Sequence, residues 1–225
     1  MVIATRVAAL PFNIDIASMS TTGVAKMPHR VEHVVRLRRA LLTQLRREAE
    51  SLGAAGVVGV RFIERPFELA SQAEEAQLDA VELAATGLAV VTPGPLLHSR
   101  QFTTTASPAA FATMLRGGYL PADVLIAGVT RLRQSGHVGE DSRVLTQRRN
   151  GEVPGQTQMI QAGRRAVVAR LQATAQQTGA DGVLVAAFAS DWSPRHSVVQ
   201  VSAVGDAIVR LRDRGLSAAA VVPMT

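Results

Sequence analysis

The chain contains no cysteine, and this absence removes several kinds of chemistry together. Disulfide bonds, thiolate metal sites and cysteine nucleophiles are excluded, so any soft-metal binding would depend on five histidines, six methionines and carboxylates. Aromatic residues are also scarce, at 4% of the sequence, whereas hydrophobic residues make up 47%. Aliphatic side chains must therefore fill the interior, and 225 residues suffice for one generous core or two small ones.

Long hydrophobic runs are absent as well. No stretch approaches the roughly 18 consecutive apolar residues of a membrane-spanning helix. The first residues, "MVIATRVAALPFNIDIAS", lack the cationic segment and sustained apolar run of a secretion signal. We therefore expect a cytoplasmic protein with no membrane span.

Lysine is almost absent, so nearly all positive charge is arginine. Lys26 is the only lysine, and the formal net charge is +6. Residues 1–93 carry nine arginines and this lysine against ten acids, whereas residues 94–225 carry fourteen arginines against eight acids. Only the second half could present a basic surface to nucleic acid or another anion.

Two pairs of segments resemble each other along the chain. "LRREAESLGAAGVVGVRF" (45–62) aligns with "LQATAQQTGADGVLVAAF" (171–188) at a separation of 126 positions, and "VELAATGLAVV" (81–91) aligns with "VQVSAVGDAIV" (199–209) at 118. The sequence thus predicts a tandem duplication of one supersecondary unit, with eight more residues in the first copy. The matching positions of the first pair are Leu45/Leu171, Ala49/Ala175, Gly53/Gly179, Ala54/Ala180, Gly56/Gly182, Val57/Val183 and Phe62/Phe188.

Each copy reads as a helix followed by strands. Apolar residues from Val34 to Leu52 recur every three or four positions, which predicts an amphipathic helix, and the stripe recurs more weakly around Leu171. Gly53 and Gly179 are suited to left-handed helix caps. Apolar and polar residues alternate from Val199 to Leu211, which indicates a strand with a mid-strand glycine that often marks a bulge or a close backbone approach. In this pattern Asp206 falls on the polar face.

The remaining segments complete an α+β fold with an antiparallel sheet covered by one main helix per repeat. We assign residues 1–92 to repeat 1, residues 93–100 to a linker and residues 101–225 to repeat 2. Repeat 2 begins with a short helix, "SPAAFATMLR", capped by Ser107, and continues into a strand at 122–132. The matching strand of repeat 1 is the N-terminal "MVIATRVAAL". The polar segments 64–77 and 133–158 are interpreted as surface loops.

The segments "LGAAGVVGVRF", "TGADGVLVAAF", "A-x-G-x-A-V" and "AVGDAIV" resemble the YbjQ-like family of bacterial domains, which carries a heavy-metal-binding label. The segment "FTTTASPAAFATMLRGGYLPADVLIAGVTRL" (102–132) resembles the lead-in of two-domain bacterial relatives. The resemblance implies a dodecin-like unit and association into a homo-oligomeric ring, commonly a pentamer. It carries over no ligand residues, because its motifs are glycines and small apolar residues.

His29, Glu32 and His33 have the H-x-x-E-H spacing of inverzincin metalloproteases, in which residues three and four apart share a helix face. The second copy has no counterpart, and such a protease needs a further glutamate ligand. We therefore predict helix-start surface residues and no catalytic zinc. Binding of a divalent ion by His29 and His33 stays open as an alternative.

Other candidate sites carry less weight. His98, His137 and His196 fall in predicted loops or turns and are interpreted as solvated. "GAAGVVG" (53–59) follows a helix and opens a strand, the reverse of a dinucleotide-binding loop. Arg148 and Arg149 are the first candidates for nucleic-acid contact, but stacking aromatics are few, so we do not expect nucleic acid as the main partner.

These residues support no catalytic, cofactor or metal site. We expect a non-enzymatic, self-associating binding or scaffold protein whose partner is a second copy of itself, and an unidentified protein partner stays open. The alternatives are a metal-binding protein using His29 and His33, or an arginine-mediated nucleic-acid binder.

Overall fold

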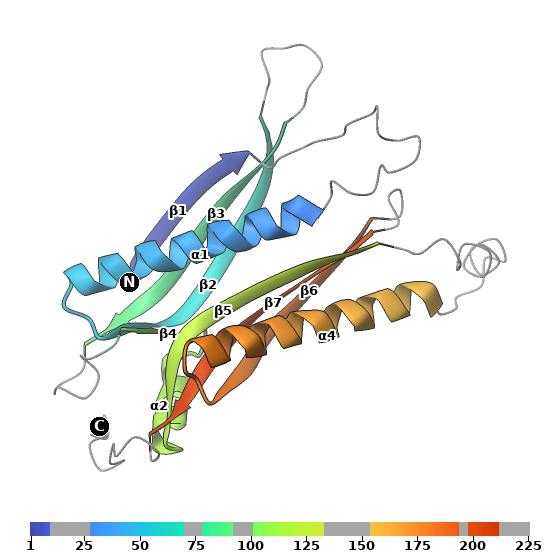
Figure 1. Ribbon diagram of the computed structural model, residues 1–225. Coiled ribbons are helices and arrows are strands. Elements are labelled where there is room, and N and C mark those ends of the chain that lie inside the picture. The colour runs from blue at the N-terminus through green and yellow to red at the C-terminus, as the bar shows by residue number, and fades with distance from the viewer. Residues whose placement is uncertain (10–27, 70–77, 92–100, 133–153, 194–197, 212–225) are drawn as a thin grey trace.

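The computed structural model describes residues 1–9, 28–69, 78–91, 101–132, 154–193 and 198–211 (Figure 1). This part of the chain contains three helices and two largely antiparallel sheets, which confirms the α+β class. The elements in chain order are β1 (Val2–Ala9), α1 (Pro28–Ser51), β2 (Gly56–Leu69), β3 (Leu78–Val90), β4 (Phe102–Thr103), α2 (Pro108–Arg116), β5 (Tyr119–Leu132), α4 (Pro154–Gln177), β6 (Gly182–Ser193) and β7 (Val198–Arg210).

The strands form two sheets, which we call sheet A and sheet B. Sheet A has the strand order β1-β3-β2-β4, and sheet B has the order β5-β7-β6. All neighbours are antiparallel except β2 and β4, which run parallel. Among the described helices, none is both long enough and apolar enough to cross a membrane.

Glycines end both long helices in the same way. Gly53 after α1 has φ 69° and Gly179 after α4 has φ 72°, the left-handed conformation expected of these caps. The next residue then donates back to the helix: Ala54 N lies 2.9 Å from Ala49 O, and Ala180 N lies 2.9 Å from Ala175 O. The predicted caps are confirmed, and each directs the chain from its helix into a strand.

The mid-strand glycines lie opposite bulges. The β2–β3 register shifts between Val58 and Arg61, and the β6–β7 register shifts between Val185 and Ala187. A Cβ on Gly205 of β7 would lie 2.8 Å from the Leu184 carbonyl oxygen of β6, closer than real Cβ atoms approach. The close backbone approach predicted from this glycine is therefore confirmed.

The layers follow the order sheet A, α1, sheet B, α4. Alternate residues of β5 face opposite sides, and they belong to different cores: Val124 and Ile126 pack with α1 and sheet A, whereas Leu125 and Ala127 pack with α4. Figure 1 shows each long helix crossing its own sheet. Helix α1 is therefore buried on two sides, by sheet A and by the β5 side of sheet B.

Several boundaries differ from the sequence-based prediction. Residues 64–69 belong to β2 and not to a loop, because they pair in an antiparallel register with residues 78–83 of β3. Pro66 is tolerated because β2 has no partner on its other side beyond β4 among the described residues. Residues 154–158 belong to α4 and not to a loop. Strand β4 follows the predicted linker yet pairs with sheet A.

We expect Gly128→Ala to lower the free energy of unfolding by about 1–3 kcal/mol, the usual effect of overpacking. A Cβ at this position of β5 would overlap the side chain of Val31 and lie 3.1 Å from Val35, both on α1. Urea denaturation would measure the loss. Gly182→Ala is the matched control, because its Cβ would meet Ile208 at an ordinary 3.5 Å. Equal stability of the two variants would contradict this account of the α1–β5 contact.

Candidate interaction surfaces

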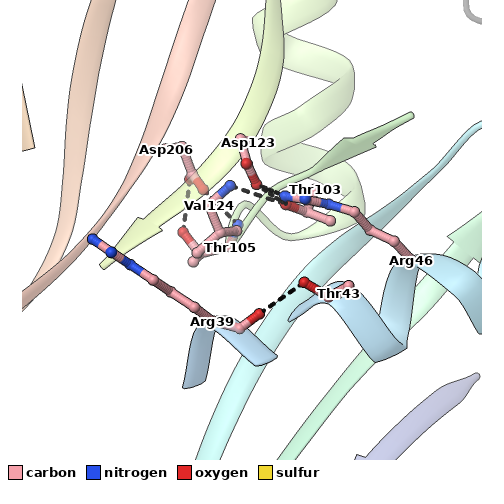
Figure 2. Close-up of polar contacts among 8 residues, drawn as sticks. All are labelled: Arg39, Thr43, Arg46, Thr103, Thr105, Asp123, Val124 and Asp206. Carbon is pink, nitrogen blue, oxygen red and sulfur yellow. Dashed lines mark hydrogen bonds and ion pairs between the residues drawn. The ribbon is translucent and has the colours of Figure 1, made fainter. Parts of the chain in front are cut away.

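A polar cluster joins the segment after β4 to sheet B. Asp206 of β7 is 3% exposed, although it falls on the strand face predicted to be polar. Its Oδ1 accepts from Thr105 N at 2.8 Å, and its Oδ2 accepts from Thr105 Oγ1 at 2.7 Å. Figure 2 shows the two residues facing each other. The carboxylate therefore fixes the backbone and the side chain of Thr105 together, although the two residues are 101 positions apart in the sequence.

A second carboxylate joins α1 to β5 and β4. Asp123 forms an ion pair with Arg46 of α1, and its Oδ1 also accepts from Thr103 Oγ1 at 2.7 Å. The same hydroxyl accepts from Val124 N at 2.9 Å. About two turns earlier on α1, Arg39 donates to the Ile126 carbonyl of β5 at 3.0 Å. Figure 2 shows Arg46 of α1, Thr103 of β4 and Asp123 of β5 meeting at one point. The cluster holds α1 against sheet B.

The electrostatics of Asp206 follow from its burial. Removal from water raises the pKa of this carboxyl above its ordinary 3.8, and the negative charge of Asp123 adds to the rise. Hydrogen bonds from the Thr105 backbone and from the side chains of Thr105 and Thr104 oppose it. Folding therefore favours the protonated carboxyl. The stability that protonation contributes is present at low pH and is lost as pH rises through the folded pKa.

We expect the stability of the wild-type chain, measured relative to Asp206→Asn, to fall as pH rises from below 3.8 through the raised pKa and then to level off. Asp206→Ala removes both acceptors of Thr105 and should cost about 1–3 kcal/mol at neutral pH. Denaturant unfolding across a pH series measures both effects. Asp191→Asn controls for loss of an exposed carboxylate. A wild-type advantage over Asp206→Asn that grows with pH would contradict the assignment.

The outer face of sheet A is open, and it carries exposed aliphatic side chains beside a few polar ones. Cross-strand pairing places Ile3 beside Thr86, and Ile63 beside Ala84, on the side of the sheet away from α1. The large apolar side chains exposed on this face are Ile3 (46%), Val7 (61%), Ile63 (44%) and Leu88 (46%), and exposed Arg61 and Arg65 flank Ile63 on the same strand. We call the four apolar residues the open face. Exposed aliphatic residues gathered on one sheet face are typical of interaction surfaces.

Sheet B provides a comparison for this face. In sheet A, Val2 pairs with the mid-strand Gly87, and in sheet B, Leu125 pairs with the mid-strand Gly205. The next residue of each strand, Ile3 in sheet A and Ile126 in sheet B, therefore occupies an equivalent position. Ile126 is 2% exposed because α1 covers it, whereas Ile3 is 46% exposed. The same position is thus covered in one sheet and uncovered in the other.

The structure describes two of the three side chains of the H-x-x-E-H motif, those of Glu32 and His33. Glu32 is exposed, and His33 is half-buried with Nδ1 3.4 Å from Arg36 Nη2. His33 was expected at the surface but is half-buried, and its Nε2 is buried and has no hydrogen-bond partner among the described residues. His29 lies in α1, but its side chain is outside the described residues. Within the described ranges, no three His, Asp or Glu residues gather as a metal site would require.

The other predicted candidates divide between described and undescribed segments. His98, His137, His196, Arg148 and Arg149 lie outside the described residues. The "GAAGVVG" segment ends α1 at Gly53 and begins β2 at Gly56, as expected, so its glycines do not open a helix.

The cluster around Asp123 and Asp206 was not identified from the sequence. Its partners are brought together only by β4 joining sheet A and by α1 packing on sheet B. A signal for the second contact was present, because Val31, Val35 and Leu42 add an apolar stripe beside the one that starts at Val34. A helix with two apolar stripes is buried on two sides.

Comparison of the chain with family models, with curated proteins and with solved structures finds no match.

Proposed function

We propose that the chain is a non-enzymatic, self-associating binding or scaffold protein built from two repeats of one α+β unit, residues 1–92 and 101–225, with β4 at the start of the second range completing the sheet of the first repeat. The repeat is supported by the two glycine caps and the two bulges. It is also supported by the corresponding strand orders of the two sheets, β1-β3-β2 and β5-β7-β6. Self-association is supported above all by Ile3, which is exposed where its counterpart Ile126 is covered by a helix.

The occupant of the open face in this proposal is helix α4 of a second copy. Within one chain, the helix of the first repeat covers the sheet of the second repeat. Repeating the same contact between chains brings α4 of one copy onto sheet A of the next. Arg165 lies on the exposed side of α4, 126 positions after Arg39, the residue that reaches from α1 to the β5 backbone.

The composition of α4 is compatible with such a contact. Between Pro154 and Gln177 it has three arginines and no acidic residue, and its exposed side carries uncharged Gln161 and Gln172. The glutamines can approach a sheet at little desolvation cost, whereas the exposed arginines must keep their guanidinium groups hydrogen-bonded, as Arg39 does with the β5 backbone. A contact between unlike surfaces propagates head to tail, and it forms a ring where the rotation closes. The resemblance to YbjQ-like domains gives five as the proposed number of chains.

Light-scattering mass across a dilution series tests this proposal. A mass that is a whole multiple of 23.8 kDa and persists on dilution supports self-association. A monomer at every concentration would refute it, and a dimer or hexamer would retain association while refuting five chains. Metal analysis of the untagged protein distinguishes the alternative class, because a stoichiometric ion would favour a metal-binding protein using His29 and His33.

A further inference from the structure

A groove runs between α4 and the first half of β6. Leu171 and Ala175 form its buried floor, Gln172 lies on its helix side, and Val183 and Val185 lie on its strand side. Strand β6 is at the edge of sheet B, and each residue from Leu184 to Asp191 is exposed. The groove thus combines apolar side chains with a strand edge that has no paired strand among the described residues.

The corresponding position in sheet A is filled by β4. Gly56, the first residue of β2, pairs on one side with Val90 and on the other with Phe102. Phe102 N donates to Ala55 O at 3.4 Å, and Thr104 N donates to Val57 O at 2.9 Å. The chain leaves sheet A at the end of β3 and returns twelve positions later to close the edge of the same sheet.

The same spacing leads to a defined segment after β7. Gly182, the first residue of β6, pairs with Ile208 as Gly56 pairs with Val90. Twelve positions after Ile208 lies Ala220, which is followed by Val221 and Val222. These three residues lie outside the described part of the chain. They are apolar, and the two valines are β-branched, which favours an extended strand.

Side-chain chemistry supports the same register. In sheet A the central residue of the returning strand is Thr103, which contacts Arg46 of α1 at 3.4 Å. The position equivalent to Thr103, 118 residues further on, is Val221. The position equivalent to Arg46, 126 residues further on, is Gln172. The hydroxyl of Thr103 is therefore replaced by the aliphatic side chain of Val221, which matches the aliphatic floor of the groove. The uncharged Gln172 in place of Arg46 needs no carboxylate partner such as Asp123.

We infer that residues 220–222 bind in the groove of their own chain as a short strand parallel to β6, with Ala220 beside Gly182 and Val221 beside Val183. In this register the backbone carbonyls of Asp181 and Val183 accept from the N–H groups of residues 220 and 222. The segment closes the start of an edge that would otherwise be free to pair with other chains. The inference rests on the repeat proposed above and does not require self-association.

A disulfide trap tests this register in the full-length chain, because the chain has no cysteine of its own. Leu184→Cys combined with Val222→Cys places the two thiols side by side on neighbouring strands, within the Cα separation that a disulfide tolerates. Mild oxidation with oxidised glutathione should give a monomeric, faster-migrating band on a non-reducing gel in most of the protein. Leu184→Cys with Ser217→Cys is the matched control and should give at least ten-fold less.

The outcomes separate the possible occupants. A cross-linked dimer would overturn the assignment to the same chain in favour of a second copy, and equal cross-linking of both cysteine pairs, or of neither, would overturn the docking itself. A monomer with the trapped disulfide supports docking even where light scattering refutes self-association. Amide hydrogen exchange is the second measurement: Val221→Asp should speed exchange at Val185, and unchanged rates would count against the proposed strand.

Discussion

Ile63→Lys and Leu88→Lys are each expected to reduce the light-scattering mass to the 23.8 kDa of one chain while leaving the fold intact. Both side chains lie on the open face, at 44% and 46% exposure, so a lysine there is solvated in the monomer. In the proposed assembly the same lysine would be buried against α4 without a partner. An unpaired buried charge costs about 3–5 kcal/mol, which weakens each contact by a factor on the order of 10² to 10³.

Leu52→Lys provides the matched control for these variants. Leu52 is 62% exposed at the end of α1, away from the open face, so the same chemical change should leave the mass of the assembly unaltered. Circular dichroism would verify that all three variants keep their secondary structure. If the assembly of the Leu52→Lys variant also dissociated, the effect would be a general one of added charge. That result would contradict the assignment of the contact to the open face.

The helix side of the contact can be tested separately. Gln161→Glu together with Arg165→Glu changes the exposed side of α4 by three charge units without touching its buried stripe. The proposed contact predicts the same dissociation as Ile63→Lys. Dissociation by Ile63→Lys with an unchanged mass for the α4 variant would instead indicate two open faces packed against each other, and would refute the head-to-tail arrangement.

The local features of the fold could be read from the sequence because each has a local cause. Gly53 and Gly179 are positioned by the need for a left-handed residue after a helix, and Ser107 caps α2 by accepting from Ala110 N. The alternation along β7 was predicted for the same reason, because Val199 and Val201 must face one side of a sheet. Such features depend on a few neighbouring residues and appear directly in the pattern.

The features missed from the sequence depend on distant parts of the chain. Asp206 falls on the polar face of β7, and only the arrival of Thr105 converts that face into a buried hydrogen-bonding site. The membership of β4 in sheet A depends on the path of the chain after β3, which no short pattern describes. The burial of α1 on two sides depends on the docking of sheet B, and this docking also determines which sheet face stays open.

Phe102 of β4 carries the most consequential of these distant contacts. Its side chain is 1% exposed, and its ring stacks on Phe111 of α2 with centroids 5.1 Å apart. It also covers Gly56, where a Cβ would lie 2.5 Å from ring atoms. One aromatic side chain therefore joins the short strand, the short helix and the edge of sheet A in a core of its own.

Phe102→Ala is accordingly expected to lower the free energy of unfolding by about 3–5 kcal/mol, the range for truncating a fully buried aromatic residue. Denaturant unfolding would measure the loss, provided that the dependence of the unfolding free energy on denaturant concentration is the same for variant and wild type. Gly56→Ala alone should also destabilise the chain, by about 1–3 kcal/mol, because its new methyl group overlaps the ring. In the double variant the methyl group enters the space that the ring has left, so Gly56→Ala should cost close to nothing there. If the free-energy losses of the two single variants instead add up in the double variant, the Phe102 ring is not the reason that residue 56 must be glycine. Substitutions of residues in direct contact have non-additive effects on stability, whereas those of independent residues have additive effects.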